Sequence, residues 1–144
     1  MPVLYTIGFT QRSARDFFTT LQKNSIQTLI DIRINNTSQL AGFTKKDDLE
    51  YFLQELLSIR YIHDTMLAPT KELLKKVHKK EISFEDYAKE FMLLLQKRQV
   101  EKNYTIEKLN NACLLCSEHS PQHCHRSLVA RYFQSFFDIQ VRHL

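Results

Sequence analysis

Glycine is scarce in this chain. Only two glycines, Gly8 and Gly42, occur among its 144 residues. The G-x-G-x-x-G loop of dinucleotide-binding folds and the Walker loop of ATPases each need more closely spaced glycines than these. The sequence therefore argues against classical dinucleotide and ATP sites.

Long apolar runs are also missing, and the longest ones are too short to cross a bilayer. The first residues, MPVLYTIGFT, lack the charged start and the cleavage site of a signal peptide. We therefore expect no membrane contact and a cytoplasmic location. In that compartment the three cysteines should be reduced.

No Pro-, Gly- or Ser-rich linker interrupts the sequence, so residues 1–144 should form a single domain. The net charge of +4 and the sequence pI near 9.0 make an anionic small molecule or a nucleic acid a plausible partner. Basic residues concentrate in residues 71–80, KELLKKVHKK. This segment fits a solvated helix face, and contact with nucleic acid is the alternative.

Short β-branched and apolar segments alternate with amphipathic ones. The predicted strands are residues 3–7, 26–32, 61–63, 112–116 and 139–142. The predicted helices start at Ser13 and Thr44 and cover residues 70–80, 84–102 and 121–137. This order predicts a single-domain α/β fold: a Rossmann-like parallel sheet of about five strands with flanking helices, and a helical insertion between strands three and four. We expect the strand order 3-2-1-4-5.

The chemistry concentrates in residues 111–137, NACLLCSEHSPQHCHRSLVARYFQSFF. Ser120 fits an N-cap and Pro121 a first helical position, which would place Cys124 in the first turn of a helix. The helix dipole would favour a thiolate there, so Cys124 is a candidate nucleophile or redox centre. The alternative is a buried structural cysteine.

The two residues after Cys124 extend this candidate site. His125 could orient a substrate or move protons, or it could be a core or capping histidine. Arg126 beside free helix N–H groups suits a phosphate, carboxylate or nucleobase ligand. The alternative is an ion pair with Glu118, Asp31 or another nearby carboxylate.

Other chemical side chains fall at predicted strand ends, which share one edge of a parallel sheet. Asp31 and Glu118 could move protons. The alternative for Asp31 and Arg33 is an internal structural ion pair between them. The predicted contacts to substrate or anion are Gly8, Arg33, His63, Cys116 and Arg126.

We expect no metal, and the sequence does not indicate a cofactor. Cys113 and Cys116 are three apart on a strand and should point to opposite faces, which argues against a shared ion. A composite site can be drawn, but no tight spacing supports it. Its ligands would be Asp31, His63, Cys116, Cys124 and His125.

Four segments in order, YTIGFTQRS, LIDIRINNTSQLAGF, YIHDTMLAPTKEL and LLCSEHSPQHCHRSLVARYF, resemble the DUF488 family of uncharacterised bacterial and archaeal proteins. The resemblance covers nearly the whole chain and is most specific at LLCSE followed by CHR. It implies an α/β domain whose site gathers the strand-end residues named above with Cys124, His125 and Arg126. It implies no reaction.

These observations favour a small cytoplasmic enzyme acting on an anionic nucleotide- or nucleic-acid-like substrate at a Cys/His/Arg site. The alternative is a binding module that uses the same crevice without chemistry. Its helpers would be Lys71, Lys75, Lys76, Lys79 and Lys80. A third possibility is an interaction subunit that dimerises through the aromatic residues 132–137, although such aromatics are more often core.

Overall fold

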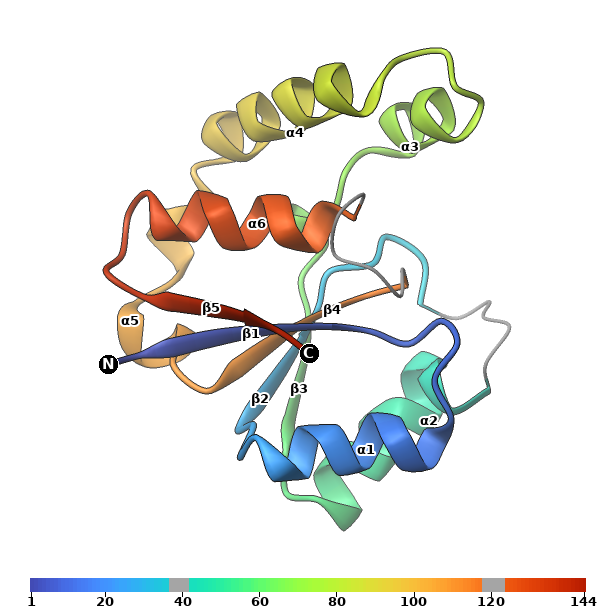
Figure 1. Ribbon diagram of the computed structural model, residues 1–144, viewed down its shortest axis with the longest axis vertical. Coiled ribbons are helices and arrows are strands. Elements are labelled where there is room, and N and C mark those ends of the chain that lie inside the picture. The colour runs from blue at the N-terminus through green and yellow to red at the C-terminus, as the bar shows by residue number, and fades with distance from the viewer. Residues whose placement is uncertain (37–41, 118–123) are drawn as a thin grey trace.

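The computed structural model describes residues 1–36, 42–117 and 124–144. Five strands form one sheet in which every neighbouring pair is parallel (Figure 1). The strands are β1 Val3–Gly8, β2 Thr28–Asp31, β3 Arg60–His63, β4 Ala112–Cys116 and β5 Gln140–His143. The α/β class and the Rossmann-like parallel sheet predicted from the sequence are therefore confirmed.

The strand order differs from the predicted one. It is β3-β2-β4-β1-β5, so β4 lies between β2 and β1. All five residues of β4 are buried, and a strand covered on both faces by apolar packing belongs at the centre of a parallel sheet. The expected contact between the first and fourth strands is present, with Gly8 opposite Cys116.

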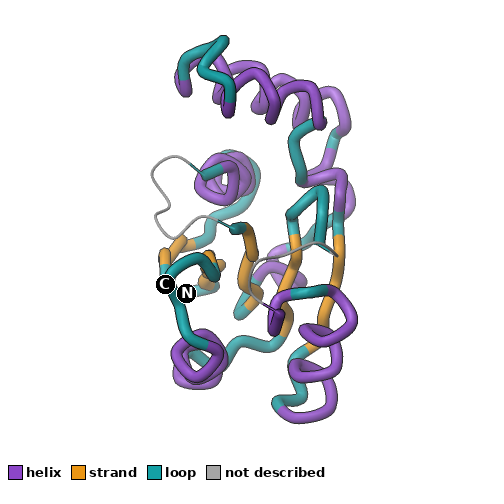
Figure 2. The backbone as a smooth tube through the Cα atoms, turned by 90° about the vertical axis from the view of Figure 1, so that its right-hand side faces the viewer, coloured by secondary structure: helices purple, strands orange, loops and turns teal. Residues whose placement is uncertain are grey.

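Helices cover both faces of the sheet, as Figure 2 shows. The α-helices are α1 Ala14–Lys23, α2 Lys46–Tyr51, α3 Lys71–His78, α4 Phe84–Arg98, α5 Ile106–Leu109 and α6 His125–Gln134. Single turns of other helix types are η1 Gly42–Thr44, η2 Phe52–Leu56, η3 Thr65–Leu67 and η4 Val100–Asn103. None of the helices in the described ranges is long and apolar enough to span a bilayer.

Two apolar clusters divide the core between the faces. One joins β-strand residues such as Leu29 and Leu115 to α1 and α2, through Phe17 and Leu49 among others. The other joins Leu114 and its neighbours to α4 and α6. The helical insertion between β3 and β4 is confirmed: α4 packs on α6, and α3 packs on α4 (Figure 1).

Side-chain caps explain where most helices begin. The hydroxyls of Ser13, Thr70 and Ser83 accept hydrogen bonds from backbone N–H groups three residues later, at 3.0–3.1 Å. The prediction that Thr44 starts a helix is wrong, because α2 starts at Lys46 and Thr44 lies buried in η1.

Two predicted helix boundaries need correction. The helix predicted to reach residue 102 ends at Arg98, because Gln99 adopts a left-handed conformation with φ of 52°. The helix predicted to start at Pro121 starts at His125, since Cys124 has extended dihedrals (φ −121°, ψ 141°) and is the N-cap. Cys124 therefore precedes the first turn of α6. The expected N-cap at Ser120 lies outside the described residues.

Candidate functional site

The carboxyl ends of β1, β2, β3 and β4 meet at one edge of the sheet. Gly8 pairs with Cys116, and Asp31 pairs with both Leu115 and His63. Since β4 is central, its carboxyl end is flanked by β1 on one side and by β2 on the other. The helices after β1 and β2 cover the opposite face from α6, which follows β4, so this edge is the usual place for a ligand in such folds.

A disulfide joins Cys116, the last residue of β4, to Cys124, the N-cap of α6. The expectation of three reduced cysteines is therefore correct only for Cys113, which is free and buried. Cys113 belongs to the cluster facing α1 and α2, whereas Cys116 and Cys124 belong to the one facing α6. Cys113 and Cys116, three apart on β4, therefore face opposite sides of the sheet, as predicted. The partner of Cys116 is Cys124 at the start of α6.

His125 is fixed by a hydrogen bond to β2. Its Nε2 lies 2.8 Å from the carbonyl oxygen of Ile32. A carbonyl oxygen only accepts, so Nε2 carries the proton and Nδ1 keeps a lone pair. Burial lowers the pKa of His125 to about 4, and the positive charge of Arg126 also lowers it. The hydrogen bond to Ile32 and the negative charge of Asp31 raise the pKa, but they do not outweigh burial. The imidazole is therefore neutral at physiological pH.

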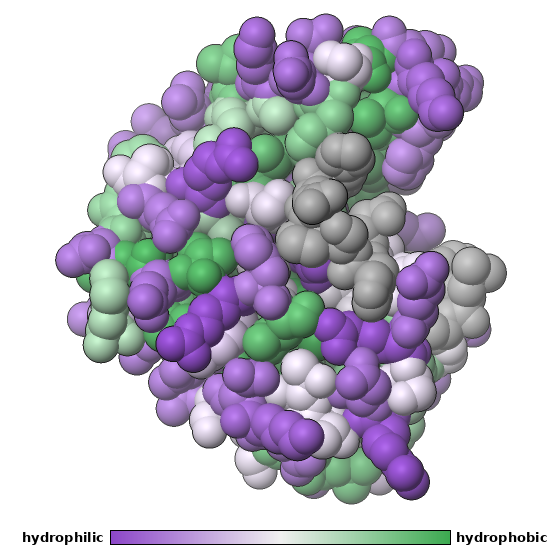
Figure 3. Space-filling view, in the orientation of Figure 1, coloured by the Kyte–Doolittle hydropathy of each residue, from purple (hydrophilic) through white to green (hydrophobic). Residues whose placement is uncertain are grey.

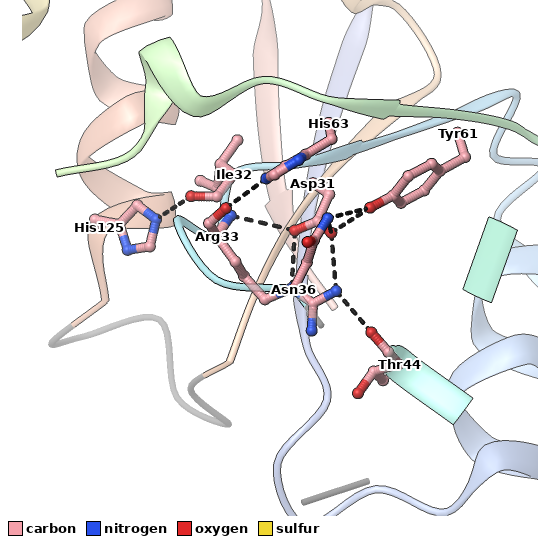
Figure 4. A network of polar contacts seen from close by, with 8 residues as sticks. All are labelled: Asp31, Ile32, Arg33, Asn36, Thr44, Tyr61, His63 and His125. Carbon is pink, nitrogen blue, oxygen red and sulfur yellow. Dashed lines mark hydrogen bonds and ion pairs between the residues drawn. The ribbon is translucent and has the colours of Figure 1, made fainter. Parts of the chain in front are cut away.

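Asp31 and Arg33 form a buried ion pair at the end of β2 (Figure 4). Arg33 donates from Nε to Oδ1 and from Nη2 to Oδ2 of Asp31, both at 2.8 Å, which is a bidentate arrangement. Nη2 also donates to the carbonyl oxygen of Thr44 at 2.7 Å. The remaining nitrogen, Nη1, is buried and has no acceptor among the described residues.

Three residues that sequence reasoning missed complete this network. The hydroxyl of Tyr61 donates to Asp31 at 2.6 Å, and Asn36 donates to that hydroxyl at 3.0 Å. Burial, and next the Asp31 carboxylate, raise the pKa of Tyr61, which keeps its proton. Tyr61 could have been found, because it lies two positions before His63 on a predicted strand. No comparable signal pointed to Asn36 or to Thr44.

His63 and His125 hold two consecutive carbonyl groups. Nε2 of His63 lies 2.7 Å from the carbonyl oxygen of Arg33, next to the Ile32 carbonyl that His125 contacts (Figure 4). The chain leaving β2 is therefore fixed from both β3 and α6. His63 has the geometry of a positioning residue in this structure, and its predicted contact with a ligand stays a prediction.

Arg126 is fully buried, with 0% of its surface exposed. Its positive charge lowers the pKa values of His125 and His143, and it partly offsets the rise that burial causes in the pKa of Cys113. The guanidinium thus acts electrostatically from the interior on one site residue, His125, and on two residues outside the site. The predicted anion contact of Arg126 stays a prediction, and Glu118 lies outside the described residues.

Gly8 lies at the end of β1 beside Cys116 with ordinary extended backbone, since no described glycine has a positive φ. The predicted close approach of a ligand to Gly8 stays a prediction.

A pocket of about 660 Å³ leads from the surface to Cys124. Cys124 and His125 form one wall, and the insertion of α3 and α4 forms the other. In Figure 3 the surface is hollowed below this insertion, on the right of the view. The further described lining residues are Leu74, Val77, His78, Lys80, Glu81, Ile82, Ser83, Phe84 and Tyr87.

Three metal-ligand atoms lie together at this wall. One donor atom each from Cys116, Cys124 and His125 lies within 4.8 Å of the others. Of the composite set drawn from the sequence, Asp31 and His63 are instead hydrogen-bonded to Arg33 and its neighbours. The arrangement can support thiol chemistry or metal binding.

Comparison with known proteins now identifies the family. Residues 13–133 match the family described as "Domain of unknown function DUF488". The chain belongs to this family. No curated protein and no solved structure matches the sequence significantly. Membership in DUF488 carries no assigned activity, so a function for this chain has to be argued from its Cys/His site.

Proposed function

We propose that the chain is a small enzyme that performs thiol–disulfide exchange through Cys116 and Cys124 on a negatively charged substrate. The observation that carries this proposal is the bond between these two sulfurs at the wall of a pocket, beside His125. Disulfides in the cytoplasm, the location that we propose for this chain, are usually transient and catalytic.

The two cysteines would have different roles. Both are buried, with 2% of Cys124 and 1% of Cys116 exposed, but of the two only Cys124 is among the described residues that line the pocket, so we assign it the first attack. Cys116 lies at the end of β4. A buried partner thiol next to the attacking one is suited to resolve a mixed disulfide.

The surroundings of Cys124 would favour its reduced form as a thiolate. It is the N-cap of α6, a helix of ten residues, whose N-terminal dipole stabilises a negative charge. One ring nitrogen of His125 lies within 4.8 Å of a sulfur of each cysteine, and Nδ1 is the nitrogen that keeps a lone pair and can take a thiol proton.

The cycle balances in two steps. The thiolate of Cys124 attacks one sulfur of a substrate disulfide, forms a mixed disulfide and releases the other substrate sulfur as a thiolate. The thiolate of Cys116 then attacks the Cys124 sulfur, which forms the Cys116–Cys124 disulfide and releases the second substrate thiolate. The substrate gains two electrons from the protein pair, and an external dithiol returns the pair to its reduced form.

Positive charge near the pocket supports an anionic substrate. Lys80 lines the pocket, and four more exposed lysines lie on α3 or just after it: Lys71, Lys75, Lys76 and Lys79. Glutathione-like thiols and nucleotides that carry a sulfur substituent are negatively charged and fit this description.

The test is reduction of a small anionic disulfide, such as oxidised glutathione, by catalytic amounts of the chain with a dithiol as final reductant. Cys124→Ser should abolish turnover. Cys116→Ser should stop after one attack and accumulate a mixed disulfide at Cys124, which intact-protein mass spectrometry detects. Cys113→Ser is the matched control and should keep full activity, because Cys113 faces the other side of the sheet.

Turnover by the Cys124→Ser variant would contradict the proposal. So would the absence of any mixed disulfide on the Cys116→Ser variant after treatment with an anionic disulfide.

The second candidate is a binding module for nucleotides or nucleic acid. The observation in its favour is that α3 and the residues just after it carry five exposed lysines and that Lys80 reaches the pocket. Binding to an oligonucleotide should then weaken steeply with salt and on replacing these lysines by glutamine. Loss of binding in those variants with exchange activity unchanged would separate the two functions. No binding even at low salt would exclude this candidate.

A further inference from the structure

We infer that Cys116, Cys124 and His125 form a binding site for one divalent transition-metal ion of the zinc type when the two cysteines are reduced. The same sulfurs are then either joined as a disulfide or bound to a metal ion. This inference needs only the dithiol form and does not rest on the proposed exchange activity.

The donor atoms are close enough for one ion. They lie within 4.8 Å of one another. Tetrahedral zinc with bonds of about 2.3 Å to sulfur and about 2.0 Å to nitrogen places its ligand atoms roughly 3.5–3.8 Å apart. The Cα atoms of the two cysteines are 7.4 Å apart, so rotation of the side chains can separate the sulfurs to that distance without moving β4 or α6.

His125 is already oriented as a ligand. Its Nε2–H donates to the carbonyl oxygen of Ile32 at 2.8 Å, which leaves Nδ1 as the coordinating atom. Metal-binding histidines almost always donate their second ring N–H in this way, to a carboxylate or a backbone carbonyl. The ring is further held edge-on against Phe91, with centroids 5.8 Å apart.

The donor types select the class of metal. Two thiolates and one imidazole are soft and borderline ligands that suit zinc, whereas calcium and magnesium prefer oxygen. Two thiolates also balance the charge of a divalent ion, so the bound ion adds no net charge to a buried site.

The fourth position would face the pocket. Cys124 and His125 line its wall, and the insertion helices form the opposite side. Three protein ligands and one open position are typical of catalytic rather than structural zinc. Water or a substrate atom could therefore reach the ion from the pocket of about 660 Å³.

Reduction and metal binding are linked stoichiometrically. Two external thiols reduce the Cys116–Cys124 disulfide and leave as one external disulfide. The two protein thiols then lose their protons as the ion binds. Re-oxidation of the pair removes both thiolate ligands and must release the ion.

The experiment is a titration of the full chain with Co²⁺ under anaerobic conditions, followed by displacement with Zn²⁺. The chain is reduced with a phosphine, which brings no competing thiol. Reduced wild type should bind one ion and show a thiolate-to-cobalt charge-transfer band with the visible bands of tetrahedral Co²⁺. The oxidised wild type contains the same residues and should show neither band.

Variants identify the ligands. Cys116→Ser and Cys124→Ser should each lose the charge-transfer intensity of one thiolate and bind zinc at least ~100-fold more weakly, since changes in outer-shell residues alone cost about 10–100-fold. His125→Gln should weaken binding while keeping both thiolate bands. Cys113→Ser should bind like the wild type, because this thiol lies on the opposite face.

Two outcomes would overturn the assignment: no charge-transfer band in the reduced wild type, or equal binding by the oxidised and reduced forms. Binding that survives in both serine variants would also overturn it, since the ion would then lie elsewhere. Metal binding without disulfide-exchange turnover would support this site and count against the proposed function. Turnover without metal binding would do the reverse.

Discussion

The imidazole of His125 at the start of α6 donates a hydrogen bond of 2.8 Å to the carbonyl oxygen of Ile32, just beyond the end of β2. This contact joins two segments 93 residues apart in sequence. It fixes which ring nitrogen carries the proton, and it holds the helix start that presents Cys124. The same side chain therefore contributes to the stability of the fold and to the chemistry of the site.

The first prediction concerns the pH dependence of folding. Burial lowers the pKa of His125 from 6.5 to about 4, so the folded protein binds fewer protons than the unfolded chain between these values. Stability from this group is complete above about pH 6.5 and decreases as the pH falls toward 4. The loss should be about 2 kcal/mol between about pH 7.5 and about pH 5.

Urea denaturation of the reduced chain at both pH values, with a metal chelator present, measures this loss. His125→Gln keeps a donor for the Ile32 carbonyl but does not titrate. Between these two pH values, its free energy of unfolding should therefore fall by ~2 kcal/mol less than that of the wild type. An equal fall in both proteins would show that protonation of His125 does not destabilise the fold.

A second prediction concerns the buried Asp31–Arg33 pair. Asp31→Ala leaves the Arg33 guanidinium buried without its carboxylate and should lower the free energy of unfolding by about 3–5 kcal/mol. Tyr61→Phe removes one hydrogen bond to the same carboxylate and should cost about 1.5–3 kcal/mol.

The ion pair between the partly buried Arg12 and the exposed Asp16 provides the comparison. Asp16→Asn should cost less than about 1 kcal/mol, because a carboxylate that stays in contact with water contributes little through its ion pair. Adding Arg33→Met to Asp31→Ala should restore part of the lost stability, since it removes the unpaired charge. If the double variant were the least stable of all, the buried pair would not be the cause of the loss.

How far the sequence predicts this molecule depends on the range of the interactions involved. Most strand and helix positions follow from local periodicity, and the local caps Ser13 and Ser83 are confirmed. The helix starts predicted at Thr44 and Pro121 are wrong. The place of β4 between β1 and β2 depends on which strand is buried on both faces, a property of the whole sheet. Local reasoning placed β1, rather than β4, next to β2.

The candidate site shows the same limit. The predicted strand ends do meet, and the Asp31–Arg33 pair is the alternative that had been left open from the sequence. Asn36 contacts Tyr61, and the carbonyl oxygen of Thr44 accepts from Arg33; these are contacts between segments apart in the sequence, which no local pattern marks. The Cys116–Cys124 bond could not be predicted, because it depends on α6 starting at His125 rather than at Pro121.

A third prediction concerns the reactivity of the cysteines. Without a reductant, native protein should resist alkylation at all three positions, because two sulfurs are bonded and Cys113 is fully buried. After reduction Cys124 should react first, since it lines the pocket. Burial raises the pKa of Cys113 and closes access to it, so it should react only in denaturant.

Peptide mass spectrometry after timed alkylation separates the three sites, and protein reduced in urea provides the fully reactive reference. Cys113 reacting as fast as Cys124 in the folded protein would mean that β4 is not enclosed by the two helical layers.

The last prediction concerns the wall of the pocket. Nη1 of Arg98, at the end of α4, donates to the carbonyl oxygens of Met66 and Ala68 at 2.8 and 2.7 Å. These bonds fasten the insertion to the segment that follows β3. Arg98→Met keeps the apolar stem but loses both bonds, and it should cost about 1.5–3 kcal/mol.

The neighbouring Lys97→Met is the matched control, because Lys97 is exposed and should change stability by less than about 0.5 kcal/mol. Hydrogen exchange should accelerate most in α3 and α4 of Arg98→Met and least in β1 and β4, since these two strands are each paired on both sides within the sheet. Ligands that need the pocket should then bind this variant more weakly while the reduced Cys124 stays reactive. Equal exchange rates in the two variants would show that packing of α4 on α6 holds the wall without Arg98.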